Sequence, residues 1–447
     1  MDGKQRSPSP YYNWDFRFAK AFKDKFAFKI AAQFIKADDW QADDYRNKQQ
    51  IGVLSKVVGG DRQSDPNFNG VNIYGDETSL NMKSFSQVVV GTGLPAIIGG
   101  LTQVLGSAPS PAQLNAILAN PSAYIPNIPQ TQALLAGIGQ VSPFYFGLQN
   151  NLIPDQNVSR TGYNEKDLVD YNTINFKGVA GLYYKITPGI EVSWNTYFGT
   201  GTTVYTGADR YSLRNLKIAQ HKLEIKAKNW FLRGYTTQEN AGDSYNASAL
   251  GGYINETWSP SSTWFGEYVG AYLQAQSAGA SPTAANTAAR AYADRNRPLP
   301  GTPQYNSILN TIKNTPIAKG GALFLDRSDL WAAEGQLNFS DALGFSDKIE
   351  VLVGAAWKQY VMNSQGTIFA DTAGVIKINE TGGYVQLRKK LFNDLLTLTA
   401  AADMINKQIL KAGSLHVSLL LSVLRKIIIY VYRTRLLIAF LQTRISI

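Results

Sequence analysis

The segments Tyr12-Asn-Trp-Asp-Phe-Arg-Phe18 and Phe26-Ala-Phe-Lys-Ile-Ala-Ala-Gln-Phe34, joined through Lys23-Asp-Lys25, carry the clearest structural signal in this chain of 447 residues. In both segments, large apolar side chains recur at alternate positions with polar residues between them. Because successive side chains of a β-strand point to opposite faces, this spacing predicts a β-hairpin with one apolar face and one polar face.

The same alternation recurs further along the chain and predicts five hairpins, or roughly ten strands. The short connections lie near residues 23–25, 187–189, 228–229, 340–348 and 390–394. Longer connections lie between them, at about 38–172, 201–214, 236–330 and 361–376. All the long connections therefore emerge at one end of the predicted sheet. This asymmetry, together with strands of about 9–11 residues or more, is typical of outer-membrane β-barrels.

A soluble antiparallel sandwich also alternates, because one face of each sheet is core and the other is solvated. Long strands and one-sided long loops favour the barrel, and the soluble sheet remains the alternative. The predicted fold class is thus all-β: an antiparallel transmembrane β-barrel with long extracellular loops. Short helices are expected inside those loops, near residues 111–119, 130–136, 271–293 and 303–313.

Composition excludes several kinds of chemistry. The chain has no Cys and only two His, so disulfides and Cys-ligated zinc are excluded and a multi-His metal site is not expected. His221 lies on the apolar parity of its strand, where a structural role is expected. No catalytic constellation is visible, so we expect no enzyme activity, no catalytic residue and no cofactor.

The run Val88–Ala96 resembles a strand followed by the GxGxxA pattern of dinucleotide sites. Pro95 lies inside the pattern, and no acid follows before Asp155, so the ribose-binding carboxylate is missing. Loop glycines are the expected explanation.

Four carboxylates crowd into the segment Asp38-Asp-Trp-Gln-Ala-Asp-Asp44. Calcium prefers such oxygen ligands, but the Asp-x-Asp-x-Asp-Gly spacing of a calcium loop is absent. A solvated loop is expected here, and no metal site.

Several segments resemble the barrel of TonB-dependent receptors of the Bacteroidetes type. The first is Phe26–Trp40, in which a strand ends in Lys36-Ala-Asp-Asp-Trp40. The others are Tyr163–Tyr171, Gly199–Tyr211, Tyr235–Tyr245, Ala333–Phe339 and Asn363–Asp371. Together the resemblance covers about residues 9–403.

The resemblance implies an outer-membrane receptor that takes up a scarce nutrient, such as a siderophore, vitamin or glycan. Such receptors have a signal peptide, a plug domain that contacts TonB, and a barrel of about 22 strands. Residues 1–10 contain no apolar leader, and no plug is visible, so residues 1–403 are expected to be a partial barrel. The implied partners are outer-membrane lipid and a small-molecule or glycan ligand, with TonB reached only through the missing plug. A passive surface β-protein and a soluble carbohydrate-binding β-sheet domain are the alternatives.

Aromatic and charged residues in the predicted loops are the candidates for substrate contact. They are Trp40, Tyr205, Asp209, Arg210 and Tyr245. Simple loop packing is the alternative role for each.

The C-terminal segment 404–447 differs from the rest of the chain. It loses the alternation and contains seven of the 43 basic residues and no acid. Removing those seven leaves 36 basic residues against 33 acidic ones, a net charge of +3 for residues 1–403 instead of +10. The charge argument for nucleic-acid binding is therefore lost. In one shifted reading frame, permitted codons from Asp403 onward spell strings that resemble further strands of the same receptors, which predicts a frameshifted tail.

Sequencing of the native locus tests this prediction. We expect the native locus to differ from the coding sequence of this chain by an insertion or deletion near codons 400–405. Translation in the shifted frame should then restore the alternating strand pattern. An intact frame through these codons would contradict it.

Overall fold

A computed structural model of the chain describes residues 10–439, with gaps at 52–53, 208, 346, 393–395, 408–411 and 424–429. From residue 407 on, only the backbone is described. The expected absence of a leader concerns residues 1–9 and lies outside the described residues.

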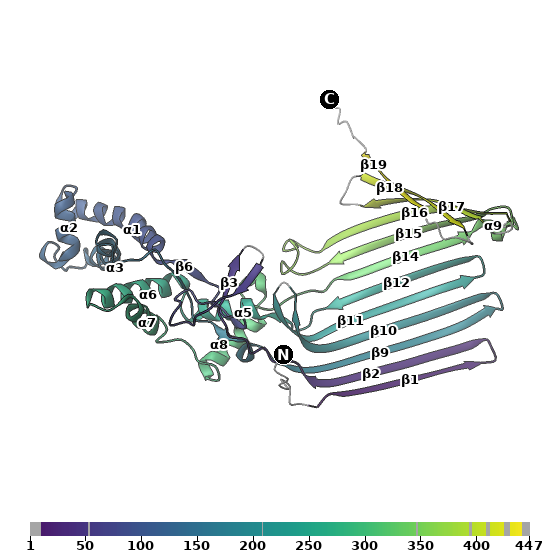
Figure 1. Cartoon of the computed structure of the whole chain (residues 1–447), viewed down its shortest axis with the longest axis horizontal. Helices are drawn as coiled ribbons and strands as arrows, with labels where there is room; N and C mark the ends of the chain where they lie inside the picture. Colours follow the sequence, from purple (N-terminus) through teal and green to yellow (C-terminus); the bar gives the residue numbers. More distant parts are fainter. Residues whose placement is uncertain are drawn as a thin grey trace, which may run out of the picture.

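Among the described residues, the largest element is an antiparallel sheet of 13 strands, shown edge to edge in Figure 1. Its order is β1-β2-β9-β10-β11-β12-β14-β15-β16-β17-β18-β19, with β13 paired to β11. The bounds are β1 Tyr12–Phe22, β2 Phe26–Asp38, β9 Asn172–Thr187, β10 Ile190–Thr206, β11 Arg210–Ala227, β12 Trp230–Asn240, β13 Tyr245–Asn246, β14 Asp329–Asn338, β15 Glu350–Met362, β16 Ile376–Leu391, β17 Leu396–Lys407, β18 Ala412–Val423 and β19 Tyr430–Ala439. The predicted antiparallel all-β class is confirmed.

The five predicted hairpins are present, and each pairs antiparallel across its short connection. At the first turn, Lys23 and Asp24 have φ of 47° and 52°, and the Lys25 amide donates to the Phe22 carbonyl at 3.0 Å. Two consecutive positive φ values define a type I′ turn, whose twist matches that of paired strands.

The predicted long connection at 201–214 is wrong. β10 continues to Thr206 and β11 begins at Arg210, with Tyr205 opposite Tyr211. The run Gly199-Thr-Gly-Thr-Thr203 looks like a loop because of its glycines, but its β-branched threonines suit a strand.

The two faces of the sheet differ chemically. On one face, Arg233 of β12 lies between Glu224 of β11 and Glu334 of β14 and forms ion pairs with both. Lys358 and Glu380 continue these pairs across β15 and β16, with 3.6 Å between Nζ and Oε1. Every strand from β9 to β16 contributes polar residues to this face.

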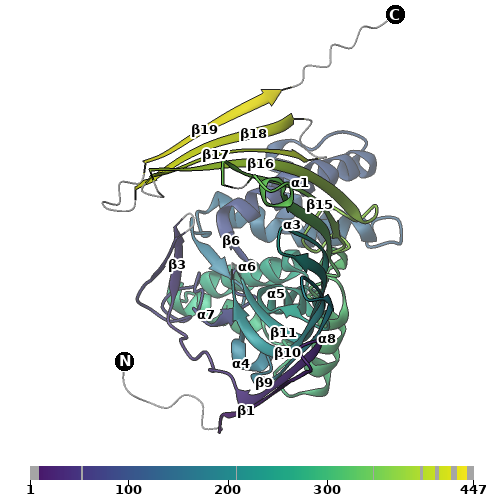
Figure 2. The ribbon, with the colours of Figure 1, turned by 90° about the vertical axis from the view of Figure 1, so that its right-hand side faces the viewer.

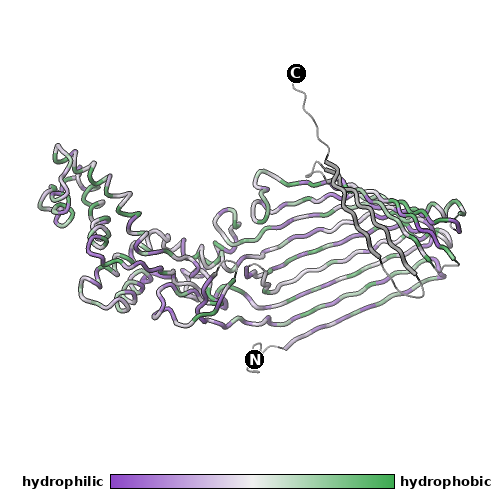
Figure 3. Tube along the Cα trace, turned by 45° about the horizontal axis from the view of Figure 1, so that its top comes forward, coloured by the Kyte–Doolittle hydropathy of each residue, from purple (hydrophilic) through white to green (hydrophobic). Residues whose placement is uncertain are grey.

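The opposite face is apolar and uncovered. Trp14 and Leu232 are 56% exposed, and Leu182 is 42% exposed. In Figure 3, hydrophobic and hydrophilic positions alternate along the strands. Figure 2 shows that the sheet is one curved layer, in which the last strands, β16 to β19, lie across the direction of β9 to β11. Among the described residues, no second layer packs against this apolar face.

The two long connections, residues 39–171 and 241–328, fold together into a helical body that we call the loop unit, at the end of the sheet opposite the short turns (Figure 1). Its helices are α1 Met82–Leu105, α2 Pro111–Ala119, η1 Pro121–Ala123, α3 Gln132–Gln149, α4 Glu165–Leu168, α5 Ala247–Trp258, α6 Ser261–Ser277, α7 Pro282–Ala293, α8 Pro303–Asn314 and η2 Ile317–Lys319. Its short strands are β3 Lys48–Ile51, β4 Leu54–Val57, β5 Ile73–Tyr74, β6 Ser79–Asn81, β7 Asn157–Ser159 and β8 Tyr163–Asn164, and α9 Phe339–Ala342 lies at the turn end of the sheet.

The helices predicted near 111–119, 130–136, 271–293 and 303–313 are thus confirmed in position. The loop-glycine interpretation of Val88–Ala96 is wrong, because these residues lie inside α1. A Cβ on Gly93 would lie 2.5 Å from a methyl carbon of Val141 in α3, so glycine permits the close approach of the two helices. α1 is also long and apolar enough to cross a membrane by length and composition alone, and it packs on α3 and α6.

The sheet continues past Asp403 through β17 to Lys407 and then through β18 and β19. The predicted frame change at this point concerns the gene, and it stays a prediction.

Leu182 and Val179 of β9 test which face meets lipid. Leu182 lies on the apolar face and Val179 on the polar face, where it is opposite Tyr197. We expect Leu182→Arg to destabilise the vesicle-inserted chain by about 2–4 kcal/mol, since lipid solvates a guanidinium poorly, and Val179→Arg to cost less. Urea titration of both variants measures the difference. Equal losses would contradict the assignment of faces.

Candidate functional site

The predicted substrate-contact residues lie where the loop unit meets the sheet. Tyr245 is buried, 3% exposed, and its hydroxyl donates to the Leu168 carbonyl at 3.0 Å. Asp209 accepts a hydrogen bond from the Asn246 amide at 3.2 Å. Both residues therefore help to join β13 and α4 to the loop end of the sheet.

Arg210 forms an ion pair with Glu165, with 2.9 Å between Nη2 and Oε1. The Glu165 side chain is fully buried and also accepts hydrogen bonds at 2.9 Å from the hydroxyls of Tyr74 and Tyr171. Burial, followed by the charge of Glu165, raises the pKa of both tyrosines. A buried charge is stable only when paired and hydrogen-bonded, and this network meets both conditions.

Trp40 and Tyr205 are more open, at 44% and 53% exposed. Next to Trp40, the Asp39 carboxylate accepts hydrogen bonds from the Thr203 hydroxyl at 2.9 Å and the Val204 amide at 3.0 Å. The structure thus brings Tyr205, Asp209, Arg210 and Tyr245 to one end of β10, β11 and β13, with Trp40 nearby. Contact of any of the five with substrate stays a prediction.

Other singled-out residues have local partners. In the acidic segment, Asp44 pairs with Arg46 at 2.7 Å. The His221 Nδ1 lies 2.8 Å from the Thr196 hydroxyl, across β10 and β11.

Two arginines, the buried Arg160 and the half-buried Arg290, join the two long connections inside the loop unit. The guanidinium of Arg160 is fully buried, donates to the Asn255 carbonyl at 3.2 Å and lies over the rings of Trp258 and Trp264. Burial lowers the pKa of Arg160. From α7 in the second long connection, Arg290 donates to two carbonyls of the first, those of Ser159 at 2.9 Å and Pro66 at 2.8 Å. These bonds hold residues from α5 and α7 against the chain around β7.

A second candidate site was not foreseen from the sequence. It is a hollow of about 590 Å³ between the β3–β4 hairpin and the β6–β7 pair, which we call the polar cavity. Its lining residues are Lys48, Gln49, Gln50, Val58, Asp65, Asn67, Asn69, Asp76, Glu77, Ser79 and Asn157. All but Val58 carry polar side chains.

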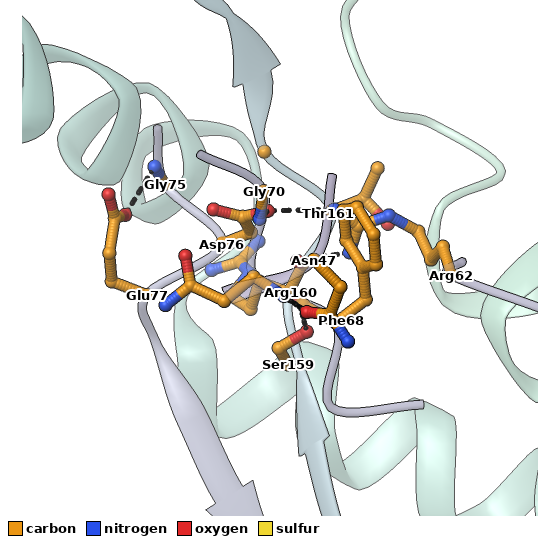
Figure 4. Close-up of polar contacts among 12 residues, drawn as sticks. Asn47, Arg62, Phe68, Gly70, Gly75, Asp76, Glu77, Ser159, Arg160 and Thr161 are labelled. Atoms are coloured by element: carbon orange, nitrogen blue, oxygen red, sulfur yellow. Dashed lines mark hydrogen bonds and ion pairs between the residues drawn. The ribbon is translucent and has the colours of Figure 1, made fainter. Parts of the chain in front are cut away.

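Asp76 lines the polar cavity at its fully buried side, which we call the floor, and Figure 4 draws it among its polar neighbours. It is fully buried, and its Oδ2 accepts hydrogen bonds from Arg62 at 2.9 Å and from the Gly70 amide at 3.0 Å. Among the described residues, neither its Oδ1 nor the buried Oδ1 of Asn69 has a hydrogen-bond partner. Glu77, the next residue, accepts from the Gly75 amide at 2.6 Å.

No protein-family model matches the chain, and no curated protein matches it. Among solved structures, it is similar to a mutant of the ferric enterobactin receptor (PfeA) from Pseudomonas aeruginosa, with a TM-score of 0.40 and 8% sequence identity. The match covers 94% of this chain and 40% of that one, so the chain spans less than half the receptor's length.

The carboxyl of Asp76 should make local stability depend on pH. Burial raises its pKa to about 7, although the neighbouring Arg62 acts in the opposite direction. An unfolded Asp has a pKa of about 3.9, so between about pH 4 and 7 the folded chain binds more protons. The free energy of opening should therefore fall as the pH rises through this range.

Hydrogen exchange of the amides of residues 70–77, corrected for intrinsic rates, measures this slope. In the Asp76→Asn variant, the free energy of opening should depend less steeply on pH, whatever its absolute value. An unchanged slope in that variant would assign the effect to another group.

Proposed function

We propose that this chain forms part of the barrel of a TonB-dependent outer-membrane receptor of the Bacteroidetes type. The receptor would take up a scarce nutrient, a siderophore, vitamin or glycan, without making or breaking a covalent bond. The observation that carries the proposal is the one-layer sheet with an uncovered apolar face and a charged opposite face. Lipid is the solvent that suits the first face, and a water-filled lumen suits the second.

Strand length supports this interpretation. β9, β10 and β11 contain 16, 17 and 18 residues, whereas about 9–11 tilted residues cross an outer membrane. The extra strand residues lie at the loop end of the sheet, where they would hold the loop unit clear of the lipid. This arrangement suits capture of a ligand outside the cell before its passage inward.

The described sheet ends at β1 and β19, which each have one paired neighbour in it. In hydrocarbon, a strand edge must find backbone partners, so a membrane barrel needs the two edges closed. We propose that further strands of the intact receptor close the barrel, and that its plug provides the contact with TonB.

A passive surface β-protein and a soluble carbohydrate-binding β-sheet domain remain the alternatives, and they give different experimental results. A passive surface protein would share the lipid contact but not a dependence on TonB. A soluble domain would show neither.

The absence of Cys allows single-cysteine labelling without background. Leu223 and Gln220 of β11 form a matched pair on opposite faces, and both are exposed. With a fluorescent thiol probe in vesicles, we expect Leu223→Cys to be quenched by nitroxide-labelled lipid and Gln220→Cys by a water-soluble quencher. Quenching of both only from water would favour the soluble domain.

Transport is tested in the native bacterium. Deletion of the locus and loss of TonB should cause the same growth defect on the limiting nutrient, because uptake needs both. A locus defect that is independent of TonB would favour the passive surface protein.

A further inference from the structure

The polar cavity has the construction of a binding site. Its volume of about 590 Å³ lies within the range of about 300–1,000 Å³ that small-molecule sites occupy. Its wall is held in place from behind: the buried Asn47 donates from Nδ2 to Asp65 at 2.7 Å and accepts from the Asn69 amide at 3.0 Å. The lining side chains are therefore placed by the fold before any ligand arrives.

Two acceptor oxygens at the floor of the cavity have no hydrogen-bond donor among the described residues. The unpartnered oxygen of Asp76 belongs to a fully buried side chain, and the buried Oδ1 of Asn69 lines the same cavity without a partner. Folded proteins rarely leave buried acceptors unpaired, so two in one cavity call for an explanation. Hydroxyl groups of a ligand, reaching the floor directly or through water, would supply the missing donors.

The walls offer donors and acceptors together. Gln49, Gln50, Asn67 and Asn157 each carry an amide, which has both an N–H₂ and a carbonyl oxygen. Three of these oxygens, those of Gln50, Asn67 and Asn157, already accept one hydrogen bond each, from Ser55, Ser79 and Asn81. A carbonyl oxygen has two lone pairs, so each retains the capacity to accept a second. A hydroxyl group likewise donates and accepts, whereas an ammonium group only donates. The acidic residues Asp65, Asp76 and Glu77 outnumber Lys48 in the lining, so the lining has no excess of positive charge to hold an anion.

We infer that the polar cavity is a subsite for a neutral, polyhydroxylated ligand, namely a short saccharide segment. The inference rests on the proposed function in naming the glycan as the class of nutrient. It also assigns capture to the polar cavity between β3, β4, β6 and β7, whose described lining includes none of the five residues predicted from the sequence.

The test uses the full chain in detergent and an array of neutral, uronate-bearing and amine-bearing oligosaccharides. We expect binding to neutral oligosaccharides, and calorimetry with the best of them gives the affinity. Asn157→Ala and Gln49→Ala should each weaken that affinity about five- to tenfold, roughly the effect of one hydrogen bond. Both side chains lie at the exposed edge of the cavity, so folding should be retained.

Gln132→Ala is the matched control, since Gln132 is an exposed amide at the start of α3, outside the cavity. Its affinity should equal that of the parent chain. Absence of binding to every neutral oligosaccharide, or equal affinity in the cavity variants and the control, would overturn the inference. Because this binding needs neither vesicles nor TonB, it can fail while the lipid and transport tests succeed, and it can succeed while they fail.

Discussion

One constraint governs this molecule: a single layer of β-sheet must keep an apolar face and a charged face apart. Backbone pairing keeps the strands together, and the pleat then sends alternate side chains to opposite faces. From β1 to β16 the chain fills one face with aromatic and aliphatic groups and the other with cross-strand ion pairs such as Arg233 with Glu334. A one-residue register slip would exchange the two sets, so the contrast between the faces also fixes the pairing.

The sheet could be predicted from sequence because its signal is local. Period-two alternation and short polar turns mark each hairpin, as around Lys23 and Asp24. The prediction failed at 201–214, where glycine and threonine alternate and local composition resembles a loop. It failed again at Gly91 and Gly93, which lie inside α1, and Gly93 packs closely against Val141 of α3, nearly fifty positions away.

The polar cavity could not be predicted, because no local pattern marks it. Lys48 to Ser79 and Asn157 come together only when β6 pairs with β7, across the whole of α1, α2 and α3. The only sequence signal is a concentration of amides and acids from Asn47 to Glu77, which by itself also describes a solvated loop. Among the residues that were predicted, the ion pair of Arg210 with the buried Glu165 attaches the loop unit to β11.

The bonds that cross the loop unit also set an order of assembly. The Asn255 amide donates to the Gly75 carbonyl across 180 positions of sequence, and Arg290 reaches the Pro66 carbonyl across 224. Closure of such large chain loops is slow and is not rewarded until both partners exist. The strands from β2 to β12 bring the two connections to the same end, so we expect the sheet to act as the template on which the loop unit folds last. The polar cavity would then form only after the strands of the sheet have paired.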